Sequence, residues 1–374
     1  MSTPAEHTSS PTADRSVTAP AILVAVGLIV AVIGALFDPV DGWAGLLTAS
    51  MFGISIAVGT LFFIAIHAVG GARWWHGVVA TSFKIARTLP VPAILLVLTL
   101  VLGLRVLYPW AVPGATETNH LLHEKAIWLN APFFLARMVV VLAIWFAVTK
   151  LLADSVTPDN QHPHAKASAS PGRAGAASLL LLAVSVSVGF WDWVMSLEPE
   201  WFSTIFSVYG FSGALHGGIA AVTVMALLKT RPGGACPVDP HARHTLGILL
   251  FAFTMFWAYI WFCQYMLIWY ANLPEETSHF ATRFTGGWQM LFWLNPIVNF
   301  VVPFVALLSV PAKKNPWLLQ RVALIILVGR WLDVYLMVTP ASGAGRSVPI
   351  YAVAATLVVV VSMLFLYNRQ SETK

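Results

Sequence analysis

Charged side chains inside apolar stretches are the residues of this chain best placed to do chemistry. Asp192 follows a long apolar run and lies among aromatic residues in the segment FWDWVMSLEPEWF. A charge at the centre of a bilayer costs about 2.5–3.5 kcal/mol on insertion scales, so it persists where it has a partner, water or a task. Two interpretations stand: Asp192 is a functional carboxylate at or near bilayer depth, or it pins the turn at residues 196–201.

A second carboxylate, Asp333, follows Arg330 by three residues in another apolar stretch. Residues three apart lie on one face of a helix, so the spacing predicts an ion pair. The pair is either a buried salt bridge that fixes helix packing or a member of a proton route.

His216 lies in the segment GALHGG, where small residues allow another helix to approach closely. An imidazole exchanges protons near neutral pH, so His216 is a candidate proton relay, with a path that could continue toward Asp192. The alternative is a hydrogen-bonded histidine in a crowded core.

The elements that must hold these residues are apolar helices. The chain has 374 residues, 58% of them hydrophobic and 10% charged, with a mean hydropathy of +0.77. Soluble domains are nearer 45–50% apolar, so the composition excludes a soluble globular protein and predicts an all-α polytopic membrane protein. Segments near the roughly 20-residue length of a membrane span predict ten transmembrane helices. They cover residues 19–37, 43–69, 88–109, 131–152, 175–195, 202–228, 246–271, 286–310, 318–338 and 347–367.

The distribution of charge predicts the orientation. Most of the 21 Lys and Arg residues fall in segments on one side if the N-terminus is inside, and short cytoplasmic loops retain such residues. Both termini are therefore expected in the cytoplasm. Acidic residues gather on the opposite side, either as solvated loop ends or as a surface for a partner, a cation or protons. The polar tail at residues 1–18 has the composition of a disordered extension.

Two patterns recur in the same order and predict an internal duplication. Trp128, Asn130 and Pro132 open the fourth span, and a similar Trp-Leu-Asn-Pro sequence starts at Trp293 in the eighth. Each is followed by a span with an Asp seven residues before a Pro. Copies in the same orientation are typical of parallel repeats. We therefore expect two four-helix bundles, at residues 43–195 and 202–338, with peripheral helices at residues 19–37 and 347–367.

Several cofactor classes are excluded by the residues present. The two cysteines, Cys236 and Cys263, cannot ligate an iron–sulfur cluster or attach a c-type haem. A b-type haem would need His67 and His216 at one depth, whereas these lie roughly 36 and 21 Å from the outer ends of their helices at about 1.5 Å per residue. The chain has no phosphate-binding loop sequence.

Three stretches carry a resemblance to a known family: KAIWLNAPFFLAR from Lys125, WVMSLEPEWFSTIFSVYGF from Trp193 and FWAYIWFCQYMLIWYANLPEETSHF from Phe256. Over nearly all ten helices the chain resembles the F subunit of bacterial alternative complex III, a membrane quinol:cytochrome c oxidoreductase. That family is similar to membrane anchors of polysulfide-reductase type, and the resemblance implies a multi-pass protein of a bacterial inner membrane. The resemblance implies a subunit without its own covalent cofactor, whose partners are a homologous membrane subunit, an iron–sulfur subunit and c-type cytochrome subunits on the outer face, with no nucleic acid.

The resemblance also implies candidate contacts for quinone. Gln264, Tyr270, Glu275 and Glu276 follow the seventh span to its outer end, and they could contact a quinone headgroup or a partner subunit. Glu275 and Glu276 could instead pair with Arg283. Arg137 is a further candidate for contact with a quinone or a partner, or it neutralises Asp192 or Glu124. Two other functions stay open, a secondary transporter and a quinol-binding anchor of a molybdoenzyme.

Overall fold

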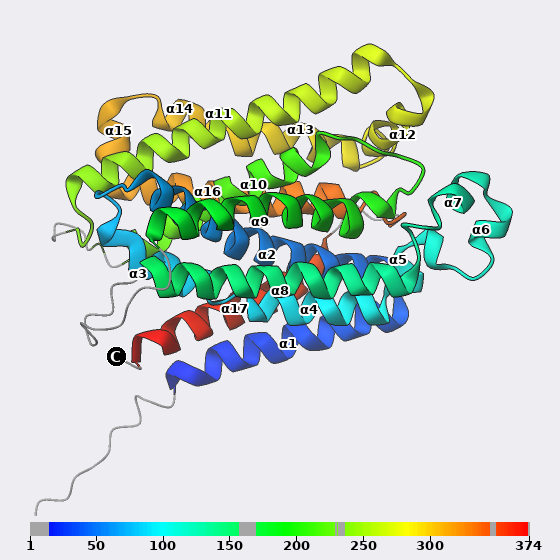
Figure 1. Ribbon diagram of the computed structural model, residues 1–374, viewed down its shortest axis with the longest axis horizontal. Helices are drawn as coiled ribbons and strands as arrows, with labels where there is room; N and C mark the ends of the chain where they lie inside the picture. The colour runs from blue at the N-terminus through cyan, green and yellow to red at the C-terminus, as the bar shows by residue number, and fades with distance from the viewer. Residues whose placement is uncertain (1–14, 157–169, 229, 231–235, 345–348, 373–374) are drawn as a thin grey trace, which may run out of the picture.

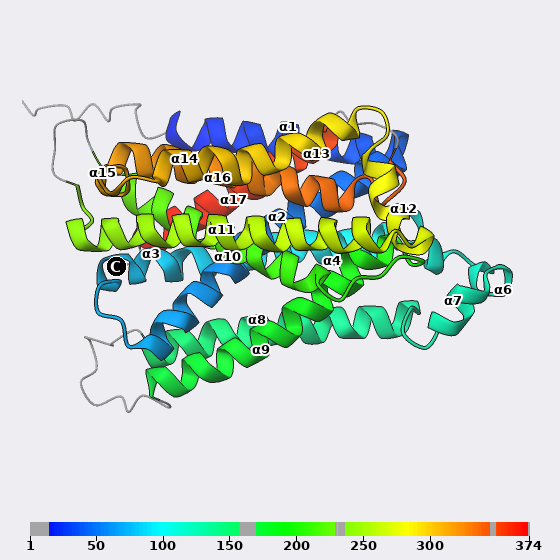
Figure 2. The ribbon, with the colours of Figure 1, turned by 90° about the horizontal axis from the view of Figure 1, so that it is seen from above.

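The structure is a computed structural model that describes residues 15–156, 170–228, 230, 236–344 and 349–372. Within these residues the chain is helical and contains no strand. The long helices run side by side along one axis of the molecule, as Figures 1 and 2 show from two directions. An all-helical bundle of apolar helices is the arrangement expected of a protein that crosses a bilayer several times.

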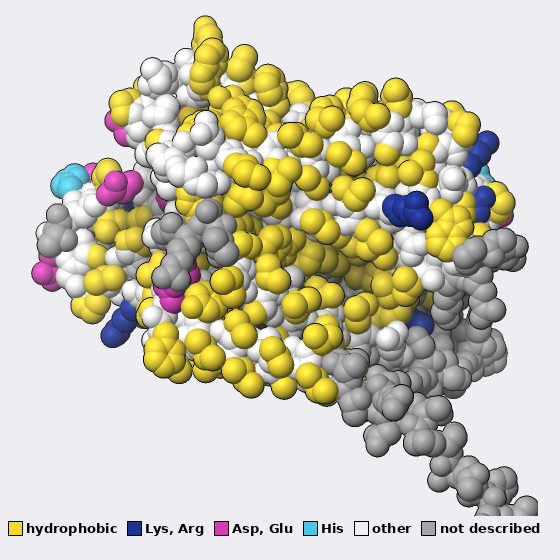
Figure 3. Space-filling view, turned by 180° about the vertical axis from the view of Figure 1, so that it is seen from behind, with side chains coloured by type: hydrophobic (Ala, Val, Ile, Leu, Met, Phe, Trp, Pro, Cys, Tyr) yellow, Lys and Arg dark blue, Asp and Glu magenta, His cyan; other side chains and the backbone are white. Residues whose placement is uncertain are grey.

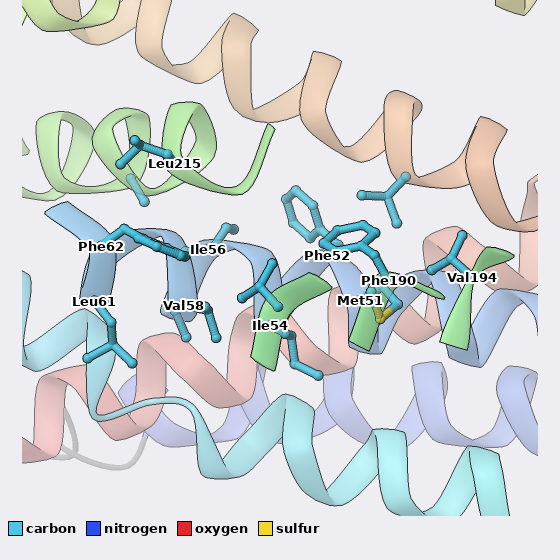
Figure 4. Packing of buried hydrophobic residues seen from close by; sticks show 14 of the residues in the cluster. Met51, Phe52, Ile54, Ile56, Val58, Leu61, Phe62, Phe190, Val194 and Leu215 are labelled. Atoms are coloured by element: carbon cyan, nitrogen blue, oxygen red, sulfur yellow. The ribbon is translucent and has the colours of Figure 1, made fainter. Parts of the chain in front are cut away.

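Two helices form the centre of the bundle, α2 (Pro39–Gly70) and α10 (Phe206–Leu227). Both are buried over most of their length, because both are apolar around their whole circumference and pack against several neighbours. Figure 4 shows part of this core, in which Phe52, Phe62 and Leu215 lie between the two helices and their neighbours.

Glycines allow α2 and α10 to approach each other closely. A Cβ atom at Gly59 would overlap the carbonyl group of Ala214, and one at Gly218 would overlap the backbone of Gly59. Small residues at such crossings let helix backbones approach and gain van der Waals contact, which drives helix association in membranes. The GALHGG segment therefore lies at the contact between the two central helices, as its small residues predicted.

The remaining long helices surround this centre. Helices α4, α8 and α9 pack with α2. Helices α11 and α16 pack with α10, and η3 and α14 pack with α11 and α16; α1 and α17 pack on each other and on α2. These contacts are compatible with two bundles and two peripheral helices, a grouping that stays a prediction. The bounds are α1 (Arg15–Phe37), α3 (His76–Ala86), α4 (Pro90–Leu102), α8 (Ala131–Val156), α9 (Pro171–Trp193), α11 (Pro240–Ala271), α13 (Trp288–Pro296), the π-helical η3 (Ile297–Val301), α14 (Val302–Leu307), α15 (Val310–Lys314), α16 (Pro316–Val338) and α17 (Ile350–Glu372).

Short elements close one end of the bundle. They are α5 (Leu104–Leu107), η1 (Pro109–Ala111), α6 (Ala115–Thr118), α7 (His120–Lys125), η2 (Met195–Leu197) and α12 (Pro274–Arg283). Helix α11 ends where Asn272 adopts the left-handed conformation, with φ 48°, and Pro274 then begins α12. An Asn in this conformation is a common helix stop, and Pro suits the first helical turn.

Within the described residues, 8 helices are long and apolar enough to cross a membrane. Helix α1 has a shorter apolar part, from Ala21 to Phe37, and α16 carries the charges of Arg321, Arg330 and Asp333. The span count of ten and the sidedness of the termini remain predictions. Of the predicted tail, residues 1–14 lie outside the described part of the chain, and α1 begins at Arg15 instead of residue 19.

One predicted span was misplaced. The third was expected at residues 88–109, but the apolar helical segment runs from His76 to Leu102. Pro90 and Pro92 suggested a helix start, whereas the helical path continues from α3 through a turn at Arg87–Leu89 into α4. Pro at the first turn of a helix loses no intrahelical hydrogen bond, so it can follow another helix directly.

The two ends of the bundle differ in charge. Figure 3 shows Asp and Glu side chains gathered at one end, most Lys and Arg side chains at the other, and hydrophobic side chains between them. We call the end that carries α6, α7 and α12 the acidic end, and the end that carries α3 and α15 the basic end. The exposed apolar belt between them fits a bilayer core.

Candidate functional site

Asp333 lies at the centre of a buried polar cluster. Its carboxylate accepts hydrogen bonds from the Tyr209 hydroxyl and from Asn295 Nδ2, the latter over 2.6 Å. Arg330 Nη2 lies 2.6 Å from Oδ2, which confirms the ion pair expected from the spacing of the two residues. Trp257 Nε1 is a more distant donor at 3.4 Å. We call these five residues, from α10, α11, α13 and α16, the Asp333 cluster.

The break in the eighth span orients one of these donors. After Pro296 the chain forms the π-helical segment η3, which brings Asn299 against α16. Asn299 Nδ2 donates to Gly329 O at 2.8 Å and to Asn295 Oδ1 at 2.6 Å. Because the Asn295 oxygen is thus engaged, its amide nitrogen faces Asp333. Single-turn π segments in helices occur frequently at functional sites.

The guanidinium of Arg330 occupies space that a glycine leaves free. A Cβ atom at Gly213 would overlap the guanidinium, and one at Gly217 would lie 3.5 Å from Arg330 Cγ. The Arg330 side chain therefore lies along the glycine face of α10. Its Nε and Nη1 have no hydrogen-bond partner among the described residues, although the residue is only 1% exposed. Buried donors of this kind are normally satisfied by ordered water.

A small cavity adjoins the Asp333 cluster. Its volume is about 30 Å³, and its polar lining consists of Tyr209, Gln264, His279, Arg283, Asn295 and Asp333. Gln264 is 4% exposed, and its Oε1 has no partner among the described residues. About 10–15 Å³ of such volume holds one water molecule, so the cavity suits one or two waters and is too small for a quinone ring.

His216 lies near Arg330 and not near Asp192. Its Nε2 is 3.1 Å from Thr254 Oγ1, and its Nδ1 has no partner in the described part of the chain. The Cβ positions of Gly213 and Gly217, on the same helix, point at Arg330. The predicted path from His216 toward Asp192 is therefore unsupported; the nearest buried charges belong to the Asp333 cluster.

Asp192 forms a second buried ion pair, with Arg137 of α8. Arg137 Nε lies 2.6 Å from Oδ2 and Nη2 lies 3.0 Å from Oδ1, a two-bond geometry that also fixes orientation. Trp128 Nε1 donates to Oδ1 at 2.9 Å, and the Arg137 guanidinium lies 4.1 Å from the Trp128 ring centroid. Of the two predicted partners of Arg137, Asp192 is the correct one.

The turn after Asp192 does not use this carboxylate. Ser196 Oγ donates to the backbone carbonyl of Asp192, while both carboxylate oxygens face Arg137 and Trp128. The interpretation that the Asp192 carboxylate pins the turn is therefore wrong, because only the backbone carbonyl of Asp192 contacts it. Asp192 is 1% exposed, and it is neutralised by Arg137.

The two buried carboxylates share one contact that involves the repeated pattern. In each half, a residue of the Trp-Leu-Asn motif donates to the Asp of the following helix: Trp128 to Asp192, and Asn295 to Asp333. The cations differ, because Arg137 comes from the helix that carries the motif and Arg330 from the helix that carries the Asp. Of the two carboxylates, Asp333 and not Asp192 lines the polar cavity found among the described residues.

A third cluster lies at the acidic end, between the loop after η2 and α12. Arg283 Nη1 is 3.2 Å from Glu198 Oε1, and the His279 ring contacts Oε2 of the same carboxylate. Arg283 also donates to the carbonyls of Leu336 and Met337 at the end of α16, at 3.0 and 3.2 Å. We call Glu198, His279 and Arg283 the acidic-end clamp.

Two groups of the acidic-end clamp, Glu198 and His279, have strongly lowered pKa values. Burial alone would raise the pKa of Glu198, but the charge of Arg283 and the hydrogen bonds lower it to about 2. Burial lowers the pKa of His279 to about 4, and Arg283 acts in the same direction. Because His279 is neutral at neutral pH, Arg283 is the cation that keeps Glu198 ionised there.

The candidate quinone contacts do not converge on one place. Gln264 lines the small cavity, Tyr270 is 83% exposed, and Arg137 is occupied by Asp192. Glu275 is exposed and Glu276 half-buried, and Arg283 pairs with Glu198 instead of either. The side chains therefore do not form one polar line, because α11 turns them to different sides and ends before the two glutamates. Their contact with a quinone or a partner subunit stays a prediction.

Sequence reasoning missed four contributors to these sites: Tyr209, Trp257, Glu198 and His279. Tyr209 and Trp257 were part of aromatic-rich helices, where a donor cannot be told from a packing residue. All four lie in the stretches that carried the family resemblance, which was the available signal.

Comparison with known proteins does not identify the chain. No protein-family model matches it, and no curated protein matches it significantly. No group of three or more His, Cys, Asp or Glu in the described ranges could hold a metal ion.

Proposed function

We propose that this chain is a membrane subunit of a respiratory quinol:cytochrome c oxidoreductase, in which it forms scaffold and a proton-exchanging centre at the Asp333 cluster. The observation that carries the proposal is a fully buried carboxylate beside a water-sized polar cavity. Intramembrane carboxylates that pair and contact water are typical of proton relays. The three stretches that resemble alternative complex III support the choice of complex.

The proposal assigns roles to residues by their contacts. Asp333 exchanges the proton, and Arg330 pairs with its carboxylate between transfers. The cavity joins Asp333 to His279 and so to Glu198 at the acidic end, which the proposal places on the periplasmic side of a bacterial inner membrane. His216 extends the buried polar groups toward the basic end.

Quinone fits the Asp333 cavity poorly, because the space suits water and not a ring. The proposal therefore assigns quinol oxidation to a partner subunit. Oxidation of a quinol releases two protons and two electrons. The electrons pass to iron–sulfur and haem groups of the partners, since the described residues offer no metal ligand set.

The first test is purification of the tagged chain in mild detergent. We expect c-type haem absorbance, an iron–sulfur signal by electron paramagnetic resonance and quinol:cytochrome c activity in the same fraction. A molybdoenzyme partner would replace the proposed complex by a polysulfide-reductase type. Recovery as a stable lone protein that carries solute flux in proteoliposomes would overturn the proposal in favour of a transporter, which the interrupted helix at η3 also permits.

The second test separates the proton role from assembly. Asp333→Asn should lower proton release per electron in proteoliposomes while haem content stays unchanged. Asp192→Asn is the matched variant: its carboxylate is equally buried and paired, but it does not line the cavity. Equal proton release in Asp333→Asn and the unmodified complex would contradict the role of the Asp333 cluster.

A further inference from the structure

Helices α16 and α17 touch near the acidic end and separate toward the basic end. Trp331 Nε1 donates to Thr356 Oγ1 at 2.9 Å, and Tyr335 and Ala352 belong to one apolar cluster there. Further toward the basic end, the space between the helices becomes a groove whose floor is formed by α2 and α10. Figure 3 shows this hollow between α16 and α17.

The groove is apolar and large. Its volume is about 210 Å³, and its lining includes Ala221, Val224, Leu324, Met363 and Tyr367. An apolar cavity of about 150 Å³ is enough to bind benzene. Thr88 also lines the groove, but its hydroxyl donates to the backbone carbonyl of Ile85. The groove therefore suits a hydrocarbon chain.

Positive charge lies where the groove reaches the basic end. Lys84 Nζ lies 5.5 Å from the ring centroid of Tyr367, a lining residue. Arg321 precedes the lining residue Leu324 by three positions, on the same face of α16, and is exposed. Arg87 is exposed three residues after Lys84. Basic pockets between transmembrane helices at the cytoplasmic side bind anionic lipid headgroups.

We propose that this groove binds one anionic phospholipid, with an acyl chain between α16 and α17 and its phosphate beside Lys84 and Arg321. A neutral lipid would fill the groove equally well but would bring no net negative charge to the basic residues beside it. The occupant would also bridge α17 to α16 where direct contact between these two helices is lost. This inference is independent of the proposed function, since it rests on no redox or proton step.

The test is native mass spectrometry of the purified full-length chain, or of the complex that contains it, after delipidation. Phosphatidylglycerol and phosphatidylcholine with identical acyl chains are added separately. We expect one phosphatidylglycerol to be retained in preference to phosphatidylcholine. Replacing Lys84 and Arg321 by Gln should weaken phosphatidylglycerol retention about fivefold for each charge and leave phosphatidylcholine retention unchanged.

A groove-filling variant tests the acyl site separately. Leu324→Trp adds bulk at a position that is 46% exposed, so folding is preserved while the groove is blocked, and retention of both lipids should fall. Lys150→Gln and Leu180→Trp are matched controls on α8 and α9, away from the groove, and should retain lipid like the unmodified chain. Equal retention of both lipids, displacement by inorganic phosphate, or full retention by Leu324→Trp would overturn the proposal.

Discussion

The backbone of Gly213 lies directly against the guanidinium of Arg330, so that any side chain at position 213 would take the place of that group. A glycine of α10 thus determines where the cation of α16 lies, and through it the charge balance of Asp333. The GALHGG segment therefore has two roles: Gly218 allows α2 to approach α10, and Gly213 leaves space for the Arg330 guanidinium.

Gly213→Ala should therefore destabilise the protein. The added methyl group forces Arg330 to move in a packed interior, and such overpacking costs about 1–3 kcal/mol. Gly217→Ala is the control, because its Cβ would make ordinary contact, 3.5 Å from Arg330 Cγ. Thermal unfolding in detergent should show a clear loss for the first variant and little for the second; equal losses would contradict the account.

Arg330 and Asp333 should be strongly coupled in a double-mutant cycle. Arg330→Met leaves Asp333 buried without its cation, and removal of one partner of a buried pair costs about 3–5 kcal/mol. Asp333→Asn together with Arg330→Met removes both charges and should recover part of that loss. Unfolding free energies of the four proteins give the coupling, and additive losses would show that the pair does not act as a unit.

Trp128→Phe tests the repeated motif. The change removes the indole donor to Asp192 but keeps an aromatic ring near Arg137, and we expect a loss of about 1–2 kcal/mol. Trp293→Phe is the counterpart in the second half, where Asn295 and not the Trp contacts the carboxylate. It should cost less in the same thermal assay. A larger loss of stability in Trp293→Phe than in Trp128→Phe would contradict the assignment of Trp128 and Asn295 as the donors to the two carboxylates.

The acidic-end clamp should weaken on acidification. The pKa of His279 is lowered to about 4 and that of Glu198 to about 2, so both groups bind protons less readily in the folded state. Their contribution to stability is fully present above the pKa values of the unfolded chain, which are near 6.5 for His279 and 4.5 for Glu198. It is lost as the pH falls through the lower pKa values of the folded state. The slope is at most about 1.4 kcal/mol per pH unit for each proton.

His279→Gln should remove the part of this loss that falls between about pH 6.5 and 4. The melting temperature of the variant in detergent should vary less with pH over that window than that of the unmodified chain. His244→Gln, at the basic end in α11, is the control and should leave the profile unchanged. An unchanged profile in His279→Gln would refute the assignment.

Part of this protein could be predicted from the sequence because it depends on single helices. Apolar length predicted long spanning helices, and residues three apart predicted the pairing of Arg330 with Asp333. Pro296 lies inside the eighth span and is followed directly by η3, and a proline inside a helix removes one intrahelical hydrogen bond. These features follow from the geometry of one helix, whatever its neighbours.

The partners of each buried charge depended on packing between helices. Tyr209 and Asn295 reach Asp333 from residues 124 and 38 positions away, and Arg283 reaches Glu198 from 85 positions away. A sequence shows which side chains are polar, but the rotation of each helix about its axis decides which of them meet. That rotation is set here by close contacts such as Gly59 with Gly218, because a packed interior tolerates one arrangement of its side chains.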